Sequence, residues 1–268
     1  MSKFFTSEVS SPGNEFDNLR WITVKSKALH RRADVTVFVP PNPENENLDV
    51  VILLHGVYGS HWAWAMNGGV HKIAHQLIEQ GKIRPMVLVM PSDGLYGDGS
   101  GYLTHLHEDY EKWIVEDVVH VVQEQIACVT NQSSFFITGL SMGGYGALRL
   151  GAKYPTVFKS FSGLSCITEF SQMAMFLEEG EFSKFSNHVV KRENVLDCLL
   201  ANKETLPHFR FDCGREDILI DFNRKLHQSL NENKIKHSYI EHPGKHEWIY
   251  WQAHIQESLL YFNEFSIY

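Results

Sequence analysis

The sequence has few of the features that mark proteins built around disulfides, metal clusters or membranes. Its four cysteines form no C-x-x-C pair, so neither a zinc knuckle nor a redox motif is predicted, and reduced, buried thiols are expected. No apolar stretch approaches the roughly 20 residues that span a bilayer. The N-terminal segment also lacks the apolar run of a secretory signal. We therefore expect a cytoplasmic protein with no membrane partner.

Positive charge is also scarce. The 268 residues include 24 Lys and Arg against 32 Asp and Glu, which gives a formal net charge of −8, and no basic run interrupts this balance. An acidic protein repels a phosphate backbone, so nucleic acid is excluded as an expected partner. The expected partner is a small molecule, and the question of a homo-oligomer stays open.

Short hydrophobic runs alternate with amphipathic segments along the chain. Val50–Leu54, Met86–Met90 and Phe135–Thr138 are unbroken apolar runs, which are typical of strands buried on both faces. Val70–Gln80 and Trp113–Ile126 carry apolar residues at helical spacing. This alternation predicts an α/β fold with a mostly parallel central sheet and helices on both faces. Further strands are expected at Trp21–Lys27, Asp34–Val39, Phe209–Phe211 and Ser238–Ile240, and further helices at Gly144–Ala152 and Asp221–Leu230.

No repeat or linker divides the chain, so one domain over residues 1–268 is expected. The polar segment Asn42–Leu48 predicts a turn. The segment 167–206 fits no β-α unit and is rich in Glu, Phe, Met and Asn. We interpret it as a small, mostly helical insertion that partly caps the sheet. Peripheral packing is the alternative interpretation of this segment.

The strongest motif is Gly139-Leu140-Ser141-Met142-Gly143, a G-x-S-x-G that follows an apolar strand and precedes a helical stretch. On such a sharp turn the serine hydroxyl projects from the sheet, and the flanking glycines relieve crowding. Backbone N–H groups at the start of the helix then face a developing oxyanion. A glycine-rich turn with an incidental serine is the alternative, but the strand and helix around the motif favour a nucleophile.

A nucleophilic serine needs a base, and the base needs an orienting acid. In α/β hydrolases the acid and then the histidine follow the serine in the chain. Asp217 and His246 both lie just beyond the ends of late predicted strands, where such sheets place their working residues. His242, at the edge of its strand, competes with His246. Glu216 and Asp212 compete with Asp217.

The early strand that ends at His55-Gly56 leads into Val57. In this fold the loop after such a strand gives the second oxyanion donor, so the backbone N–H groups of Val57 and Met142 are the expected pair. Some of the aromatic residues near these loops are expected to wall a substrate pocket, because ligand sites favour aromatic linings. The aromatic residues near these loops are Tyr58, Trp62, Trp64, Tyr96, Tyr102, Trp248 and Trp251. Trp248, Trp64 and Tyr58 are the substrate-binding candidates among them, and ordinary packing is the alternative for each.

Several histidines have spacings that zinc could use. His71 and His75 lie four residues apart on a predicted helix, and His105 and His107 lie in a loop. His71 is not followed by Glu, so the metalloprotease motif is absent. We expect neither a catalytic metal nor any other cofactor.

Five segments together resemble one known family. They are LLHGVYGSHWAW at 53–64, VLVMPSDG at 87–94, FFITGLSMGGYGAL at 135–148, CGREDILIDFN at 213–223 and HPGKHEWIYW at 242–251. They are similar to the putative-esterase family, which includes esterase D (S-formylglutathione hydrolase), mycolyltransferases, feruloyl and acetylxylan esterases, and tributyrin esterases. The pattern HG-x-x-G before a tryptophan most resembles the tributyrin esterase-like branch of acetylesterases.

This resemblance implies an α/β-hydrolase fold and a triad of Ser141, Asp217 and His246. It also implies an oxyanion hole from Val57 and Met142, and a place for Trp248 at the substrate pocket.

The implied activity is that of a serine carboxylic-ester hydrolase acting on short-chain acyl esters or acylated sugars through an acyl-enzyme. An acyltransferase that uses the same triad is the main alternative. A serine peptidase or an inactive binding module fits the sequence less well.

Overall fold

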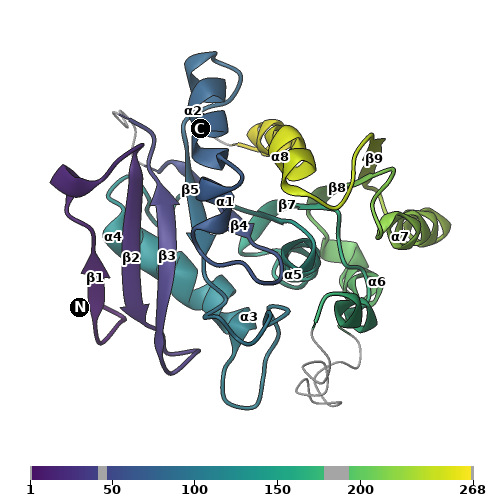
Figure 1. Cartoon of the computed structure of the whole chain (residues 1–268), viewed down its shortest axis with the longest axis horizontal. Coiled ribbons are helices and arrows are strands. Elements are labelled where there is room, and N and C mark those ends of the chain that lie inside the picture. The colour runs from purple at the N-terminus through teal and green to yellow at the C-terminus, as the bar shows by residue number, and fades with distance from the viewer. Residues whose placement is uncertain (1, 42–46, 178–192, 267–268) are drawn as a thin grey trace.

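The computed structural model describes residues 2–41, 47–177 and 193–266, and one nine-stranded sheet runs through it (Figure 1). The strands are β1 (Ser7–Val9), β2 (Leu19–Lys25), β3 (Arg32–Phe38), β4 (Asp49–Leu54), β5 (Met86–Pro91), β6 (Phe135–Gly139), β7 (Phe158–Leu164), β8 (His208–Gly214) and β9 (Ser238–His242). Five successive strand pairs from β5 to β9 are parallel, whereas β1, β2 and β3 form antiparallel pairs that join the sheet at β5. The predicted α/β fold with a mostly parallel sheet is confirmed.

The two faces of the sheet carry two separate hydrophobic clusters. Along β4, Val50, Ile52 and Leu54 belong to one cluster, whereas Val51 and Leu53 belong to the other. Successive side chains of a strand point to opposite faces, so an unbroken apolar run supplies both clusters. This is why the runs in the sequence show no alternation.

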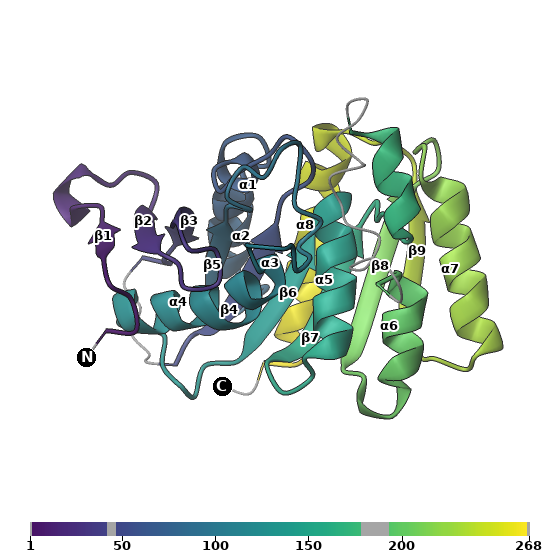
Figure 2. The same ribbon diagram turned by 90° about the horizontal axis from the view of Figure 1, so that it is seen from below.

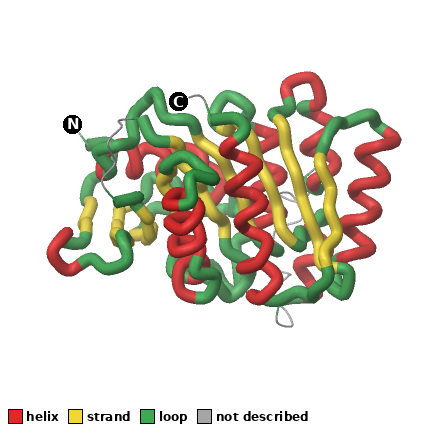
Figure 3. The backbone as a smooth tube through the Cα atoms, turned by 90° about the horizontal axis from the view of Figure 1, so that it is seen from above, coloured by secondary structure: helices red, strands yellow, loops and turns green. Residues whose placement is uncertain are grey.

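Helices cover both faces. The principal helices are α1 (Ala63–Met66), α2 (Val70–Glu79), α3 (Tyr110–Lys112), the π-helical stretch η2 (Trp113–Val118), α4 (Val119–Gln125), α5 (Met142–Lys153), α6 (Val195–Ala201), α7 (Ile220–Glu232) and α8 (Trp248–Asn263). One cluster includes apolar residues of α4 to α7, and the other includes residues of α1, α2 and α8. Figure 2 shows α5 and α6 in front of the strands and α8 behind them. Figure 3 views the sheet from its other side and shows helices in front of the strands there as well. Among the described helices, none combines the length and apolar character that crossing a bilayer requires.

The strand order β1-β2-β3-β5-β4-β6-β7-β8-β9 reverses direction around β4. From β4 the chain first moves outward to β5, and then returns to the other side of β4 as β6. Where strand order reverses in this way, the loops after the two neighbouring strands diverge and leave a crevice at their carboxyl ends. The loop after β4 carries Val57, and the turn after β6 carries Ser141.

Two strands are absent from the sequence prediction. β1 is short and lies at the sheet edge, and β7 reads FKSFSGL, which is not an apolar run. The serines of β7 are nevertheless buried: the Ser162 hydroxyl donates to Thr138 Oγ1 (2.7 Å) and the Ser160 hydroxyl to the His208 carbonyl (2.7 Å). Hydrogen bonding offsets the cost of burying them, so a central strand need not be apolar.

The predicted insertion at 167–206 falls partly outside the described residues, as does most of the predicted turn Asn42–Leu48. Its described parts contain the short 3-10 helices η3 (Phe170–Met175) and η5 (Lys203–Thr205), together with α6. Arg149 of α5 anchors this region, because its buried guanidinium pairs with the Glu193 carboxylate.

Candidate active site

Ser141 lies on the turn between β6 and α5 with φ 54° and ψ −117°. A positive φ is uncommon for a residue with a side chain and costs on the order of 1–3 kcal/mol, so it persists only where the surroundings enforce it. Here the Ser141 N–H donates to the Leu164 carbonyl of β7 (2.9 Å), and the Ser141 carbonyl accepts from Tyr145 N–H (3.0 Å). The strained turn is therefore held from both sides.

The glycines of the motif are explained by close backbone approach. A Cβ atom at Gly139 would lie 2.3 Å from the Gly143 carbonyl oxygen. A Cβ atom at Gly143 would lie 2.2 Å from the Leu54 carbonyl oxygen at the end of β4. Both contacts are with backbone, which cannot move aside, so each position requires glycine.

His246 lies between Ser141 and Asp217. Its Nε2 is 3.0 Å from Ser141 Oγ, and its Nδ1 is 3.0 Å from each carboxylate oxygen of Asp217. The Asp217 side chain is fully buried, and its Oδ1 also accepts the Leu219 N–H at 2.8 Å. These contacts fix the orientation of the carboxylate, which in turn orients the imidazole.

The structure places two of the competing residues away from the serine. His242 Nε2 faces the Glu257 carboxylate at 3.1–3.2 Å. Asp212 accepts a hydrogen bond from Tyr250 Oη (2.9 Å) and pairs with Arg210 (3.0 Å). Burial raises the pKa of the Asp212 carboxyl to about 6, although Arg210 and the hydrogen bond from Tyr250 oppose this shift. Neither residue contacts the imidazole that faces the serine.

Glu216, the third competitor, binds the backbone of the loop that carries His246. Its carboxylate accepts the Gly244 N–H at 2.6 Å, and its own N–H donates to the Gly244 carbonyl at 3.1 Å. The Arg215 N–H donates to the His242 carbonyl (2.8 Å), and a Cβ atom at Gly214 would lie 2.2 Å from the Gly244 oxygen. Hydrogen bonds thus join the loop that carries Asp217 to the loop that carries His246. Sequence reasoning missed this structural role of Glu216.

The loop after β4 lies beside the serine. A Cβ atom at Gly56 would be 3.5 Å from Ser141 Cβ. A Cβ atom at Gly99 would meet both Met142 Sδ (2.4 Å) and Val57 Cγ1 (3.6 Å), so the two expected oxyanion residues lie close together. Among the described residues, neither Val57 N–H nor Met142 N–H has a hydrogen-bond acceptor. Both groups therefore keep the capacity to bind an oxyanion.

His55 fixes the loop after β4, a role that sequence reasoning did not anticipate. Its ring is buried; Nδ1 lies 2.7 Å from the Gly56 carbonyl, and Nε2 accepts the Asp93 N–H at 3.2 Å. The Tyr102 hydroxyl, predicted near the pocket, instead donates to the His55 carbonyl at 3.0 Å. The signal for His55 was its place directly before Gly56 at a strand end.

A cavity of about 550 Å³ opens at the serine. Tyr58 and Trp248, both predicted at the pocket, line it. Trp64, also predicted at the pocket, is not among the lining residues. α1 turns its side chain toward the sheet, where Nε1 donates to the Leu54 carbonyl at 3.0 Å and the ring meets Trp248 edge-on. The lining residues are Gly56, Val57, Tyr58, Gly59, Trp62, Ala63, Asn67, Leu140, Ser141, Phe176, His246, Glu247, Trp248 and Trp251.

Phe176 of the predicted insertion is a wall residue that sequence reasoning missed. Its ring stacks on the His246 ring at 5.2 Å between centroids, and its carbonyl accepts the Tyr58 hydroxyl. Trp251 meets the same imidazole edge-on at 5.0 Å. Apolar rings therefore flank the histidine and limit its contact with water.

The four histidines considered for zinc are dispersed. His71 faces Asp17 at 3.7 Å, His75 faces Glu79 at 3.3 Å, and His105 Nε2 lies 2.8 Å from the Ser100 carbonyl. Within the described ranges, neither these nor His107 belong to a group of three side chains able to hold a metal. His105 and His107 instead line a second, more open hollow of about 770 Å³ that includes none of the residues around the serine.

Comparisons with known proteins give esterases and a serine hydrolase. An acetyl esterase from Caldicellulosiruptor saccharolyticus is 24% identical over 91% of this chain and 98% of its own. The structure of a ferulic acid esterase superposes with a TM-score of 0.80 at 21% identity, covering 98% of this chain and all of that one. A fluorophosphonate-binding serine hydrolase, FphF of Staphylococcus aureus, gives a TM-score of 0.76 at 21% identity, over 91% of this chain and 98% of its own.

The match to a family model extends over residues 26–262 and bears the description Putative esterase. The predicted resemblance is confirmed, and because this match covers most of the chain, the protein belongs to the Putative esterase family and is an esterase.

Proposed function

We propose that this esterase hydrolyses carboxylic esters with Ser141 as nucleophile, His246 as general base and Asp217 as the orienting acid. The observation that carries this proposal is the continuous chain of 3.0 Å contacts from Ser141 Oγ through the imidazole to the buried carboxylate. The strained serine turn and the adjoining cavity support it, because a hydroxyl projecting into a cavity is what acyl transfer requires.

In the first half-reaction, Ser141 Oγ attacks the ester carbonyl carbon and His246 Nε2 takes the hydroxyl proton. The carbonyl oxygen becomes an oxyanion, which the N–H groups of Val57 and Met142 would bind. Collapse breaks the bond to the alcohol oxygen, which leaves with the proton from the histidine. A water molecule then repeats these steps on the acyl-enzyme and releases the acid.

The proposed substrates are esters of short acyl groups, of two to four carbons, including acylated sugars. The acetyl esterase relative supports the acyl length. The cavity of about 550 Å³ far exceeds an acetyl group and so has room for the alcohol portion. Its walls include Trp62 and Trp248, and aromatic faces of this kind suit flat or ring-shaped ligands. The cytoplasmic location stays a prediction.

The decisive test is covalent labelling. A fluorophosphonate should modify Ser141, and Ser141→Ala should abolish labelling and lower kcat by roughly 10⁴–10⁶-fold. Modification of a different serine in the wild-type protein would contradict the assignment. His246→Ala should be inactive, whereas His242→Ala, its matched control, should keep the triad; the reverse result would exchange their roles.

A panel of p-nitrophenyl esters of increasing acyl length, together with acetylated xylan and feruloyl esters, tests the substrate class. We expect kcat/KM to be highest for acetate to butyrate, and a higher value for a long-chain ester would contradict this. Product analysis with an added alcohol separates hydrolysis from the acyltransferase alternative, because a transferase would form the new ester in place of the free acid.

A further inference from the structure

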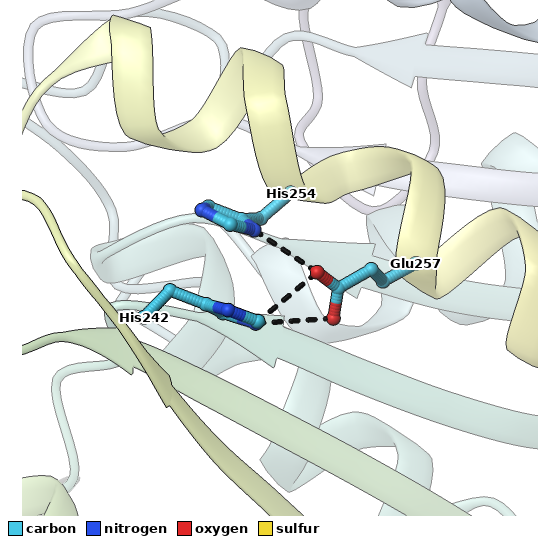
Figure 4. Close-up of side chains that lie close together, drawn as sticks. All are labelled: His242, His254 and Glu257. Atoms are coloured by element: carbon cyan, nitrogen blue, oxygen red, sulfur yellow. Dashed lines mark hydrogen bonds and ion pairs between the residues drawn. The ribbon is translucent and has the colours of Figure 1, made fainter.

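A second cluster of polar side chains lies where β9 meets α8, outside the set of residues that line the catalytic cavity. Figure 4 shows His242, the last residue of β9, and His254 of α8 converging on the carboxylate of Glu257. Glu257 Oε1 lies 3.1 Å from His242 Nε2 and 3.0 Å from His254 Nδ1. The mechanism proposed above uses none of these three residues.

These two separations are a few tenths of an ångström shorter than those between the ligands of a single transition-metal ion. In a tetrahedral zinc site with bonds of about 2.0–2.1 Å, neighbouring ligand atoms lie about 3.3–3.4 Å apart. The three donor atoms lie within 4.8 Å of one another, and within the described part of the chain this is the one group of three such side chains. Two imidazoles and one carboxylate form a donor set that suits Zn²⁺ better than Mg²⁺ or Ca²⁺, which prefer oxygen ligands.

The surroundings of the cluster also suit a dication. Arg210 donates to the other carboxylate oxygen, Glu257 Oε2, at 2.9 Å, and so leaves Oε1 directed at the two histidines. Arg210 is itself held by Asp212 at 3.0 Å and by Ser258 Oγ at 3.1 Å. Outer hydrogen bonds of this kind orient metal ligands. The formal charges of Arg210, Asp212 and Glu257 sum to −1, which favours an added cation.

The cluster is accessible. The side chains of His242, His254 and Glu257 are 22%, 17% and 29% exposed, which leaves a side open for a water molecule as fourth ligand. The two rings are stacked, with centroids 4.0 Å apart and an interplanar angle of 14°. Because each nitrogen lone pair lies in its ring plane, an ion shared by both rings requires them to tilt apart, and each ring to carry its proton on the other nitrogen. Partial exposure gives the rings the room to do so.

We propose that His242, His254 and Glu257 form a structural Zn²⁺ site that joins the end of β9 to α8. These two elements flank the loop that carries His246, since His242 precedes it and α8 begins at Trp248. An ion here would restrain that loop at both ends without touching substrate. Zinc binding should therefore raise thermal stability and leave the chemical step intact.

The test measures zinc directly on the full chain, expressed without a polyhistidine tag, stripped with chelator and dialysed against micromolar Zn²⁺. We expect one zinc per chain in the wild-type protein by elemental mass spectrometry. His254→Gln and Glu257→Gln should each weaken binding by at least about tenfold, the lower end of the effect known for outer-shell changes. Circular dichroism of both variants checks that they fold.

Two matched controls locate the ion. His75→Gln removes a histidine that faces a carboxylate, Glu79, on α2 but belongs to no group of three ligands among the described residues. His246→Gln removes the histidine at the serine. Both variants should keep the zinc. Substitution with Co²⁺ should give visible absorption that the His254→Gln variant lacks.

The proposal is overturned if the wild-type protein takes up no zinc under these conditions, or if the His254→Gln and Glu257→Gln variants keep it. It is also overturned if the zinc disappears in the His246→Gln variant, because the ion would then belong to the catalytic site. These readouts do not depend on turnover, so they stand apart from the test of the proposed ester hydrolysis.

Discussion

Replacing Asp217 by Asn tests the member of the proposed triad that has two competing carboxylates nearby in the sequence, Asp212 and Glu216. The substitution keeps the size of the side chain and an oxygen that can accept from Leu219 N–H, so the fold should survive. It removes a buried negative charge whose two oxygens lie 3.0 Å from His246 Nδ1. When the imidazole takes the serine proton it becomes positive, and the carboxylate then stabilises that charge.

The size of the effect follows from this geometry. Two unit charges about 4 Å apart in a site of effective dielectric constant about 20 attract by about 4 kcal/mol, which corresponds to roughly 10³ in rate. Loss of the tautomer that presents Nε2 to the serine adds to this, so a fall in kcat on the order of 10⁴ is expected.

The assay is kcat and KM for p-nitrophenyl acetate, with thermal denaturation to check the fold. Glu216→Gln is the matched control, because glutamine can still accept the Gly244 N–H; kcat should change by less than about tenfold. If Asp217→Asn stays within tenfold of the wild type while Glu216→Gln loses activity, the acid has been assigned to the wrong carboxyl.

Three further predictions concern the pH dependence of stability, the effect of a chelator on activity, and the glycine that follows the serine turn. Burial lowers the pKa of His61, His71, His105 and His237 below the ordinary value of 6.5. Just below pH 6.5 the unfolded chain therefore binds more protons than the folded protein. The free energy of unfolding should fall as the pH drops through that value, by up to about 1.4 kcal/mol per pH unit per histidine. His61→Gln should flatten this slope in denaturant titrations, exposed His107→Gln should not, and a slope equal to the wild type in both would refute the cause. EDTA should leave kcat/KM unchanged, since the proposed chemistry uses no metal, and loss of activity restored by one specific ion would overturn this. Gly143→Ala should cost both activity and melting temperature, because its Cβ would lie 2.2 Å from the Leu54 oxygen; an active, equally stable variant would show that the turn can relax.

The strands around the site could be predicted because their cause is local. The runs that became β4, β5 and β6 are apolar throughout, and burial on both faces requires that pattern. β7 has no such run because hydrogen bonds to neighbouring strands satisfy its serines. α8 is absent from the sequence prediction, although its buried apolar residues lie at helical spacing: Trp251, Ile255, Leu259 and Phe262.

The positions of Ser141, Asp217 and His246 could be proposed from sequence because each directly follows a strand and parallel strands end at one edge. Glu216 could not be understood in this way. Its partner, Gly244, lies 28 residues further along the chain, and only the packing of two loops brings them together. The aromatic walls were predicted in part for a related reason: α1 has four residues, too few for a periodic pattern to separate Trp64, which faces the sheet, from Trp62, which faces the cavity.

Because the loops around Gly214 and Gly244 are joined, the proposed triad rests on two structural units rather than three: the paired loops that carry Asp217 and His246, and the turn that carries Ser141. The acid and the base travel together, because backbone hydrogen bonds fasten their loops to each other, whereas the serine belongs to the turn between β6 and α5. Relative motion of these two units changes one separation above all, that between Nε2 and Oγ. A substitution far from the cavity that loosens α8 should therefore lengthen this contact while leaving the His246–Asp217 pair intact.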